Sequence, residues 1–201
     1  MNLKPEDFVL ERRLNKLTDV INKRQLDITI VLENINDPHN LSACLRTCDT
    51  TGIKDVHLLY HGKQPFPKIG KTSSASAWKW IDKTRHRTVE ECFDHLRTQG
   101  KKIYTTHLSH DAVSLYDMDF TQPTALVFGN EHVGVSDEAI ALADGNFLIP
   151  QVGMIQSLNI SVACAVSLYE VFRQRQEAGL YDTPQIKGTD FDNLLYDWVR
   201  R

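Results

Sequence analysis

The stretch 146–161 combines an apolar run, a turn and a helix start, an arrangement that can cradle a ligand. Its first residues read as a short strand that Pro150 stops, and Gly153 provides a hinge in the loop that follows. Ser157 and Asn159 are both good helix caps, so either residue can begin the next helix. The first N–H groups of a helix have no partner within the helix and can bind a ligand. An ordinary strand-to-helix connection would explain these residues equally well.

Two further segments place polar residues directly after apolar strands. Lys102–Thr106 and Thr124–Phe128 read as strands, and the second opens into Gly129–Gly134. Ligands of open parallel sheets bind beyond the carboxyl ends of the strands, so all three loops are candidates. Gly129–Gly134 is spaced like a phosphate-binding loop, but Val135-Ser136 replaces the Lys-Ser/Thr pair that such a loop requires. The residues alone therefore predict a small-molecule site without naming its ligand.

A strongly basic window, His61–Arg87, stands out in an acidic chain. It holds seven Lys or Arg and one acid, Asp82, and so carries +6 on a chain whose net charge is −3. Such asymmetry is typical of a nucleic-acid contact surface, and Trp78 and Trp80 could stack on RNA bases. Two alternatives stay open: a solvated basic loop, and tryptophans that anchor this loop in the core.

Hydrophobic periodicity and cap residues indicate where the secondary structure lies. Helices are predicted over 5–24, 37–51, 88–100, a short segment after Ser136, a long segment from 157 or 159 to about 179, and 191–199. Strands are predicted over 28–32, 56–60, 102–106, 124–128 and 146–149. Strands that alternate with helices predict an α/β fold with a mostly parallel sheet and helices on both faces.

The composition excludes several classes of protein. No apolar run is long enough to cross a membrane, and no secretory signal begins the chain, which favours a cytoplasmic protein. The cysteines form no C-x-x-C pair and lie in helical patterns, so we expect them to be buried and reduced; they are Cys44, Cys48, Cys92 and Cys164. A metal site built from these and the eight histidines is not expected.

Three ordered motifs carry a family resemblance. They are Asn40–Arg46, Phe128–Gly134, and Ile149-Pro150 followed by Gln156–Ser161. Together they resemble the three motifs of SpoU-type members of the SPOUT methyltransferase superfamily, over roughly residues 28–175. The upstream pairs Arg12-Arg13 and Arg24-Gln25 resemble the tRNA (guanosine-2′-O)-methyltransferase branch, often called TrmH.

The resemblance implies a fold, an activity and partners. It implies transfer of a methyl group from S-adenosylmethionine to a ribose 2′-hydroxyl of tRNA, at the D-loop guanosine of position 18. It also implies a C-terminal deep trefoil knot and a homodimer with active sites at the interface. Residues 26–179 would then form the knotted methyltransferase domain, preceded by a helical RNA-contact extension, 1–25, and followed by a linker and helix, 180–201. The alternatives are another RNA target, such as the tRNA wobble nucleotide or ribosomal RNA, and a non-catalytic RNA-binding protein on this fold.

The resemblance also assigns roles to individual residues. The cofactor would contact Thr106, Gly129, Ile149 and Leu158. The contacts to RNA that we expect come from the first helix and the basic window: Arg12, Arg13, Lys79, Lys83 and Arg85.

The central catalytic position corresponds to Arg46. An arginine is effectively always protonated, so we interpret Arg46 as a clamp for phosphate and developing negative charge rather than as a base. The other polar motif positions would hold Arg46 and the ribose, and Glu131 could serve as a local base; these positions are Asn40, Glu131, Ser157 and Asn159.

Overall fold

The computed structural model describes residues 10–67, 76–107, 109, 111–155 and 157–201. Within these residues, one sheet runs through the molecule in the order β3-β2-β1-β6-β4-β7-β5, and every pairing of its strands is parallel. The strands are β1 (Ile28–Glu33), β2 (Asp55–Leu59), β3 (Asp82–His86), β4 (Lys102–Thr106), β5 (Val113–Ser114), β6 (Thr124–Phe128) and β7 (Gly145–Leu148).

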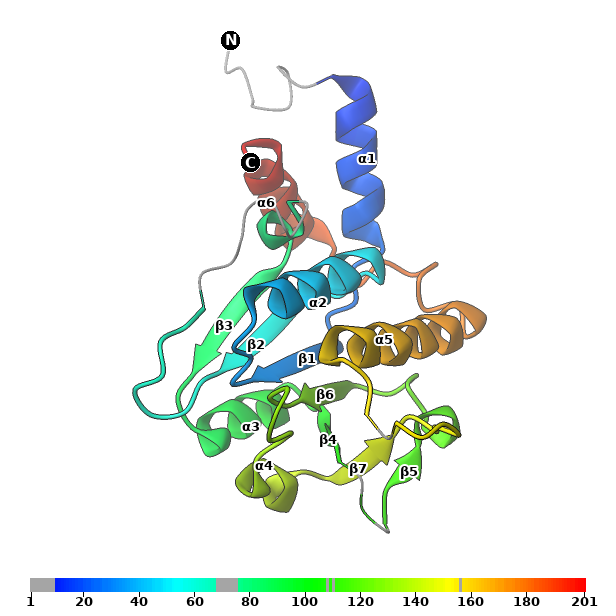
Figure 1. Ribbon diagram of the computed structural model, residues 1–201. Helices are drawn as coiled ribbons and strands as arrows, with labels where there is room; N and C mark the ends of the chain where they lie inside the picture. Colours follow the sequence, from blue (N-terminus) through cyan, green and yellow to red (C-terminus); the bar gives the residue numbers. More distant parts are fainter. Residues whose placement is uncertain (1–9, 68–75, 108, 110, 156) are drawn as a thin grey trace.

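Helices cover both faces of this sheet. α2 and α5 lie side by side on one face, and α3 and α4 cover the other (Figure 1). The helices are α1 (Glu11–Asn22), α2 (Pro38–Thr50), α3 (Val89–Thr98), α4 (Asp137–Leu142), α5 (Ile160–Glu177) and α6 (Gly188–Val199); short 3-10 turns are η2 (Ala77–Lys79) and η3 (Leu115–Asp117). The predicted α/β fold with a parallel sheet is therefore confirmed.

The central strand β1 explains why the sheet must be covered twice. All six of its residues are buried. Ile30 and Leu32 belong to the core under α2 and α5, whereas Val31 belongs to the core under α3 and α4. Side chains alternate across a strand, so a strand that is buried at every position needs cover on both faces.

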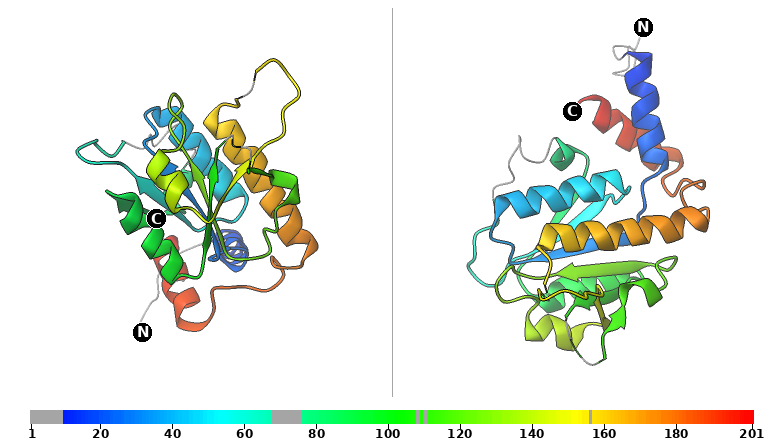
Figure 2. Two further views of the ribbon diagram at one scale, coloured as in Figure 1. Left: turned by 90° about the horizontal axis from the view of Figure 1, so that it is seen from below. Right: turned by 45° about the vertical axis from the view of Figure 1, so that its right-hand side comes forward.

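The first and last helices, α1 and α6, pack against each other above the sheet. α1 and α6 share a small core that includes Ile21 and Trp198, and the ring of Trp80 meets Trp198 edge-on at 5.1 Å between centroids. Figure 2 shows the two helices together at one end of the molecule. Trp80 thus anchors the basic window in the core. In the part of the chain described, no helix is long and apolar enough to cross a membrane.

A buried arginine ties α5 to the start of β1. Arg175 is fully buried and makes a two-pronged ion pair with Asp27, at 2.6 and 2.7 Å. Its Nε donates to Gln25 at 2.8 Å, and its Nη1 donates to the carbonyl of Phe120 at 3.0 Å. A buried guanidinium is tolerated only when its donors are satisfied, so these partners fix how α5 lies along the sheet.

Most predicted boundaries agree with the structure, but two strands were missed. Asp37, Thr88, Ser136 and Asn159 each cap a helix through the side chain, so α5 begins after Asn159 rather than Ser157. β3 lies inside the basic window, where a loop was expected, and β5 has only two residues.

The structure tests the remaining predictions to different degrees. All four cysteines are free and buried, as predicted. The first predicted helix is described only from Leu10 onward, and Lys68, Lys71, Ser73, Ser74 and Gln156 lie outside the described residues. The trefoil knot stays a prediction.

Removal of the Arg175 side chain should destabilise the fold strongly. Arg175→Ala leaves Asp27 without its partner, and we expect the free energy of unfolding in urea to fall by about 3–5 kcal/mol. Arg173→Ala is the matched control, because Arg173 lies two residues away on the same helix with an exposed side chain that pairs with exposed Glu177 and with Glu170, which keeps a hydrogen bond from Gln174. Its loss should cost less than about 1 kcal/mol. Equal losses in the two variants would contradict the anchoring role of Arg175.

Candidate active site

A cavity of about 650 Å³ opens at the carboxyl edge of the sheet. Its walls come from the ends of three neighbouring strands, β4, β6 and β7, and from the start of α5. All four residues predicted to contact a cofactor line it: Thr106, Gly129, Ile149 and Leu158. The cavity also has Glu131, Ser157 and Asn159 in its wall. The three loops that follow these strands therefore enclose one site, as parallel strands require.

The loop after β6 folds back on itself at Gly129. Asn130 and Gly134 exchange two backbone hydrogen bonds of 2.9 Å, which closes a tight turn. A Cβ on Gly129 would lie 2.1 Å from the backbone of Gly134 and of Val135. Only glycine fits there, because any side chain would push the two backbone segments apart.

Three catalytic candidates from distant segments form one hydrogen-bonded chain. Asn40, in the first turn of α2, donates from Nδ2 to Oε1 of Glu131 at 3.0 Å. Asn159 donates from Nδ2 to Oδ1 of Asn40 at 3.2 Å. Asn159 also accepts from the backbone N–H of Ser161 and so begins α5. The chain thus fixes the two helix starts against the loop after β6.

The two carboxylate oxygens of Glu131 differ in their hydrogen-bond partners. Its Oε2 is buried and has no hydrogen-bond partner among the described residues. Burial and the nearby negative charge of Glu131 raise the pKa of Tyr60, which stays protonated and donates to the carbonyl of Ile35 at 2.7 Å. An unpartnered buried carboxylate oxygen can accept a hydrogen bond or a proton from a ligand hydroxyl.

Arg46 stands apart from this group. It lies six residues after Asn40 on α2, about 9 Å along the helix axis. Its side chain is exposed and, within the described residues, makes no hydrogen bond or ion pair, and it does not line the cavity. The structure therefore assembles Asn40, Glu131, Ser157 and Asn159 but leaves Arg46 on the outer surface of the helix.

Two buried residues that support the site were missed by the sequence argument. Asn130 donates to the carbonyl of Asn34 at 2.8 Å and accepts from the N–H of His132, so it holds the glycine loop against the end of β1. Glu33, 1% exposed, accepts from the N–H of Ser136 at 3.0 Å and contacts Nε2 of His61 at 2.6 Å. The signal for Asn130 was present, since an asparagine directly after a strand favours such a turn. The sequence held no such signal for Glu33, because it ends an apolar strand.

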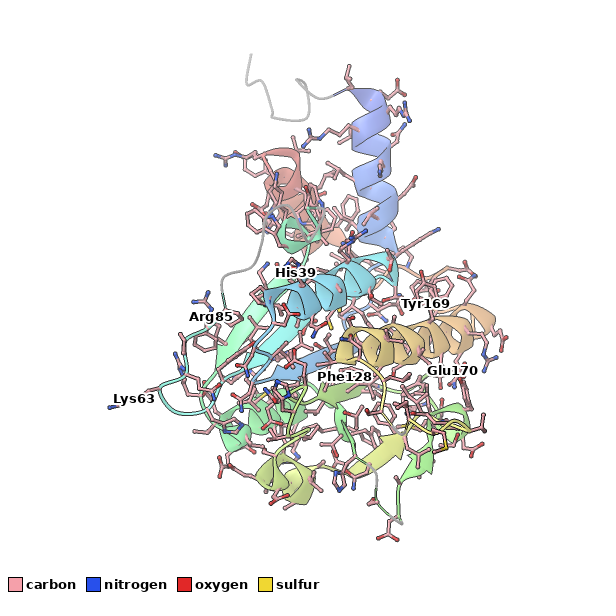
Figure 3. The ribbon with its side chains drawn as sticks, viewed as in Figure 1. His39, Lys63, Arg85, Phe128, Tyr169 and Glu170 are labelled. Carbon is pink, nitrogen blue, oxygen red and sulfur yellow. The ribbon has the colours of Figure 1, made fainter. Side chains whose placement is uncertain are left out.

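The side chains predicted to contact RNA differ in their solvent exposure. Arg12 and Arg13 are exposed on α1. Arg85 is exposed on the edge strand β3, where its guanidinium lies 5.0 Å from the ring centroid of Phe66 (Figure 3). Lys79 is half-buried. Lys83 instead turns its ammonium group to the carbonyls of Trp78 and Ile81, and burial lowers its pKa.

The fold and the cavity together define a parallel α/β protein with room for a small ligand at the carboxyl edge of its sheet. The SpoU rRNA Methylase family model matches residues 27–169. The chain therefore belongs to the SpoU methylase family, as its three motifs predicted.

Similar proteins agree with this assignment. The chain is 44% identical, over 95% of its length and 97% of the relative's, to a tRNA (guanosine(18)-2′-O)-methyltransferase of Thermus thermophilus. The crystal structure of the A. aeolicus TrmH/SpoU tRNA modifying enzyme is 35% identical with a TM-score of 0.88, covering 94% of this chain and 96% of that one. The methyltransferase AviRb from Streptomyces viridochromogenes, in complex with the cofactor AdoMet, is 29% identical with a TM-score of 0.66, covering 76% and 59%.

A methyl group added at Gly129 should disturb the site more than one added in the next loop. Gly129→Ala forces the turn between Asn130 and Gly134 to open, and we expect the free energy of unfolding to fall by about 1–3 kcal/mol. Gly153→Ala is the control, because the nearest atom to its Cβ would be 4.0 Å away. Its effect should stay within about 0.5 kcal/mol. Amide hydrogen exchange at Gly134 should speed up only in the first variant, and equal exchange in both would refute the argument.

Proposed function

We propose that the protein transfers a methyl group from S-adenosylmethionine to the ribose 2′-hydroxyl of guanosine 18 in tRNA. The observation that carries the proposal is the single cavity in which the four predicted cofactor residues lie beside Glu131, Ser157 and Asn159. The substrate follows from the printed activity of the Thermus thermophilus relative, which matches almost the whole chain.

The cavity fits S-adenosylmethionine in size and in chemistry. Its volume of about 650 Å³ lies within the range of cofactor pockets. Backbone groups of the Gly129–Gly134 turn and the half-buried apolar side chain of Ile149 can hold the cofactor, together with Thr106 and Leu158, which also line the cavity. When bound, the cofactor supplies an electrophilic methyl group on a sulfonium centre.

The residues of the chain must position and activate a weakly acidic hydroxyl. Glu131 offers Oε2 as an acceptor for the ribose proton, while Asn40 holds the other carboxylate oxygen. Asn159 keeps the amide of Asn40 in the orientation that donates to Glu131. The guanidinium of Arg46 would clamp the phosphate next to the ribose and stabilise charge that develops on the oxygen.

We also propose that the site is completed in a homodimer. α5 exposes the apolar side chains of Val162 and Tyr169 (Tyr169 is labelled in Figure 3), and such exposed apolar surface on a helix favours cover by a partner. Exposed apolar residues continue into the loop before it: Val152, Met154, Ile155 and Leu158. The free side chain of Arg46 lies on the neighbouring helix α2, so a second copy seated on this face would enclose both the arginine and the mouth of the cavity.

The proposed RNA surface runs along the basic side of the chain. Arg12 and Arg13 on the helical extension 1–25 would contact the tRNA body, and Lys79 and Arg85 would contact its backbone. Residues 26–179 would form the catalytic domain, and 180–201 would fix the extension through the α1–α6 contact.

The decisive assay uses labelled S-adenosylmethionine and two unmodified tRNA transcripts that differ only at position 18. We expect label in the transcript with a ribose at guanosine 18 and none in the transcript with 2′-deoxyguanosine there. Label on the deoxy transcript, mapped to the wobble nucleotide, would move the activity to another tRNA position. Absence of label on any tRNA or ribosomal RNA would overturn the enzyme assignment.

Arg46→Ala should separate turnover from cofactor binding. Loss of the clamp should lower kcat by about 100-fold or more, while calorimetry should find the affinity for S-adenosylmethionine unchanged because Arg46 does not line the cavity. Arg97→Ala is the control, since Arg97 is also exposed but lies on α3, across the sheet. A collapse of cofactor affinity in Arg46→Ala would show that the role given to Arg46 is wrong.

Salt dependence should distinguish the basic residues from one another. Arg85→Ala and Lys79→Ala should each weaken tRNA binding and reduce the slope of log K against log salt by about 1. Lys83→Ala should change the slope less, because its ammonium already serves two carbonyls within the chain. Lys102→Ala, exposed at the start of β4, is the charge-matched control. Unchanged slopes for Arg85 and Lys79 would assign the basic window to structure.

A further inference from the structure

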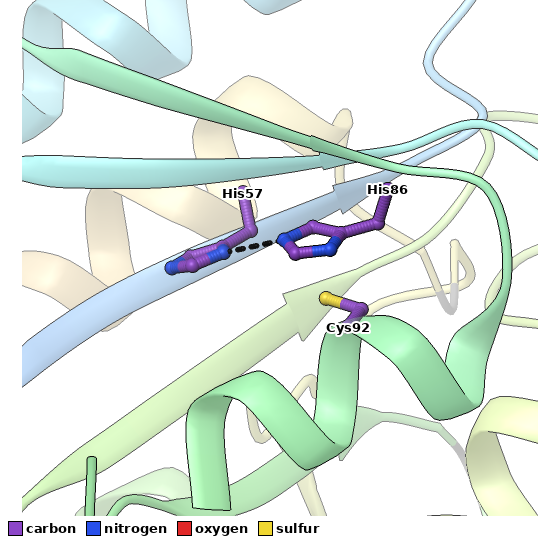
Figure 4. A group of neighbouring side chains, drawn as sticks. All are labelled: His57, His86 and Cys92. Carbon is purple, nitrogen blue, oxygen red and sulfur yellow. Dashed lines mark hydrogen bonds between the residues drawn. The ribbon is translucent and has the colours of Figure 1, made fainter. Parts of the chain in front are cut away.

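Three side chains of types that can ligate metals lie together in the core on the α3 side of the sheet. His57 comes from β2, His86 from β3 and Cys92 from α3 (Figure 4). Their possible ligand atoms all lie within 4.8 Å of one another. The three residues are 1%, 3% and 0% exposed, and none of them lines the cavity described above.

The two imidazole rings face each other through one nitrogen each. Nδ1 of His57 lies 2.9 Å from Nε2 of His86. On the outer sides, Nε2 of His57 lies 3.1 Å from a carboxylate oxygen of Asp55, and Nδ1 of His86 lies 3.6 Å from Oε1 of Glu91. A carboxylate accepts hydrogen bonds, and a neutral ring has one donor and one acceptor nitrogen. With Nε2 of His57 donating to Asp55, Nδ1 of His57 carries a lone pair, which accepts the N–H of His86 Nε2, and the buried Nδ1 of His86 has no hydrogen-bond partner.

This pattern is the one that surrounds histidine ligands of metals. A histidine that binds a metal usually donates its other ring N–H to a carboxylate, which fixes the tautomer and the orientation of the ring. Here Asp55 provides such a carboxylate for His57, whereas Glu91 lies 3.6 Å from Nδ1 of His86, beyond hydrogen-bond distance. Cys92 adds a sulfur beside the facing nitrogens, and a set of nitrogen and sulfur ligands suits zinc and related transition metals.

A proton shared between the rings is the competing explanation. A single N–H between the two rings accounts for the 2.9 Å contact, and a bound metal ion would displace it. Burial raises the pKa of the Cys92 thiol to about 12, so a metal would also have to displace that proton when it binds.

We propose that His57, His86 and Cys92 bind one divalent transition metal ion of the zinc class, through Nδ1, Nε2 and Sγ. The ion reaches them from a surface hollow of about 520 Å³ that is lined by Asp55, His57 and His95. His95 follows Cys92 by about one helical turn, and its ring centroid lies 5.4 Å from that of His57, which places a further nitrogen next to the open side of the group. The ion would join β2, β3 and α3, and this role is separate from methyl transfer.

The test uses protein without a histidine tag, stripped of metal by a chelator and checked to be folded by circular dichroism. Titration with Zn²⁺ should show one bound ion per chain and a rise in Tm, and Co²⁺ should give a thiolate-to-cobalt charge-transfer band. Cys92→Ser should abolish the band, whereas Cys48→Ser, an equally buried thiol in the other core, should keep it. Asp55→Asn should lower the affinity for Zn²⁺ by about 10–100-fold.

Two results would overturn the proposal. The first is a folded wild-type protein that takes up neither Zn²⁺ nor Co²⁺ in stoichiometric amount, which would leave a proton between the rings. The second is a charge-transfer band or a zinc affinity that Cys92→Ser leaves unchanged, which would place the ion elsewhere. The wild-type titration tests the proposed metal site even if Cys92→Ser does not fold.

Discussion

The candidate site depends on the hydrogen-bonded chain that runs from Asn159 through Asn40 to Glu131. Its members start α5, start α2 and follow β6, so it joins three segments that the sheet brings to one edge. Each member also satisfies a local need: Asn159 caps its helix, and the Asn40 amide pairs with a buried carboxylate. The same contacts therefore hold the fold together at this edge and set the geometry of the reacting groups.

Local sequence signals predicted most of the elements for physical reasons that the structure bears out. Cap residues such as Asp37 and Ser136 accept hydrogen bonds from their own helices, and apolar runs such as β1 and β6 are buried. The edge strand β3 was missed because its residues are mostly charged, as suits a strand at a sheet edge. β5 was missed because two residues carry no periodicity.

The site was predictable in its parts but not in its connections. The motifs indicated which loops matter, yet the partners of Asn40 lie 91 and 119 residues away in the sequence, beyond the reach of any local pattern. Arg24 and Gln25 suggested a branch of the family and prove to be structural: Arg24 is buried against Asp49, and Gln25 accepts from Arg175. The histidine and cysteine cluster was invisible for the same reason as the polar chain, because three separate elements supply its members.

A double-mutant cycle on Asn40 and Asn159 tests the central claim that the polar chain acts as one unit. The specificity constant kcat/KM for tRNA methylation would be measured for the wild type, Asn40→Ala, Asn159→Ala and the double variant. If the two residues act through Glu131 in series, the double variant should be about as slow as the slower single variant, with a coupling energy of about 0.5–3 kcal/mol. Losses that simply multiply would show two independent residues and would contradict the account.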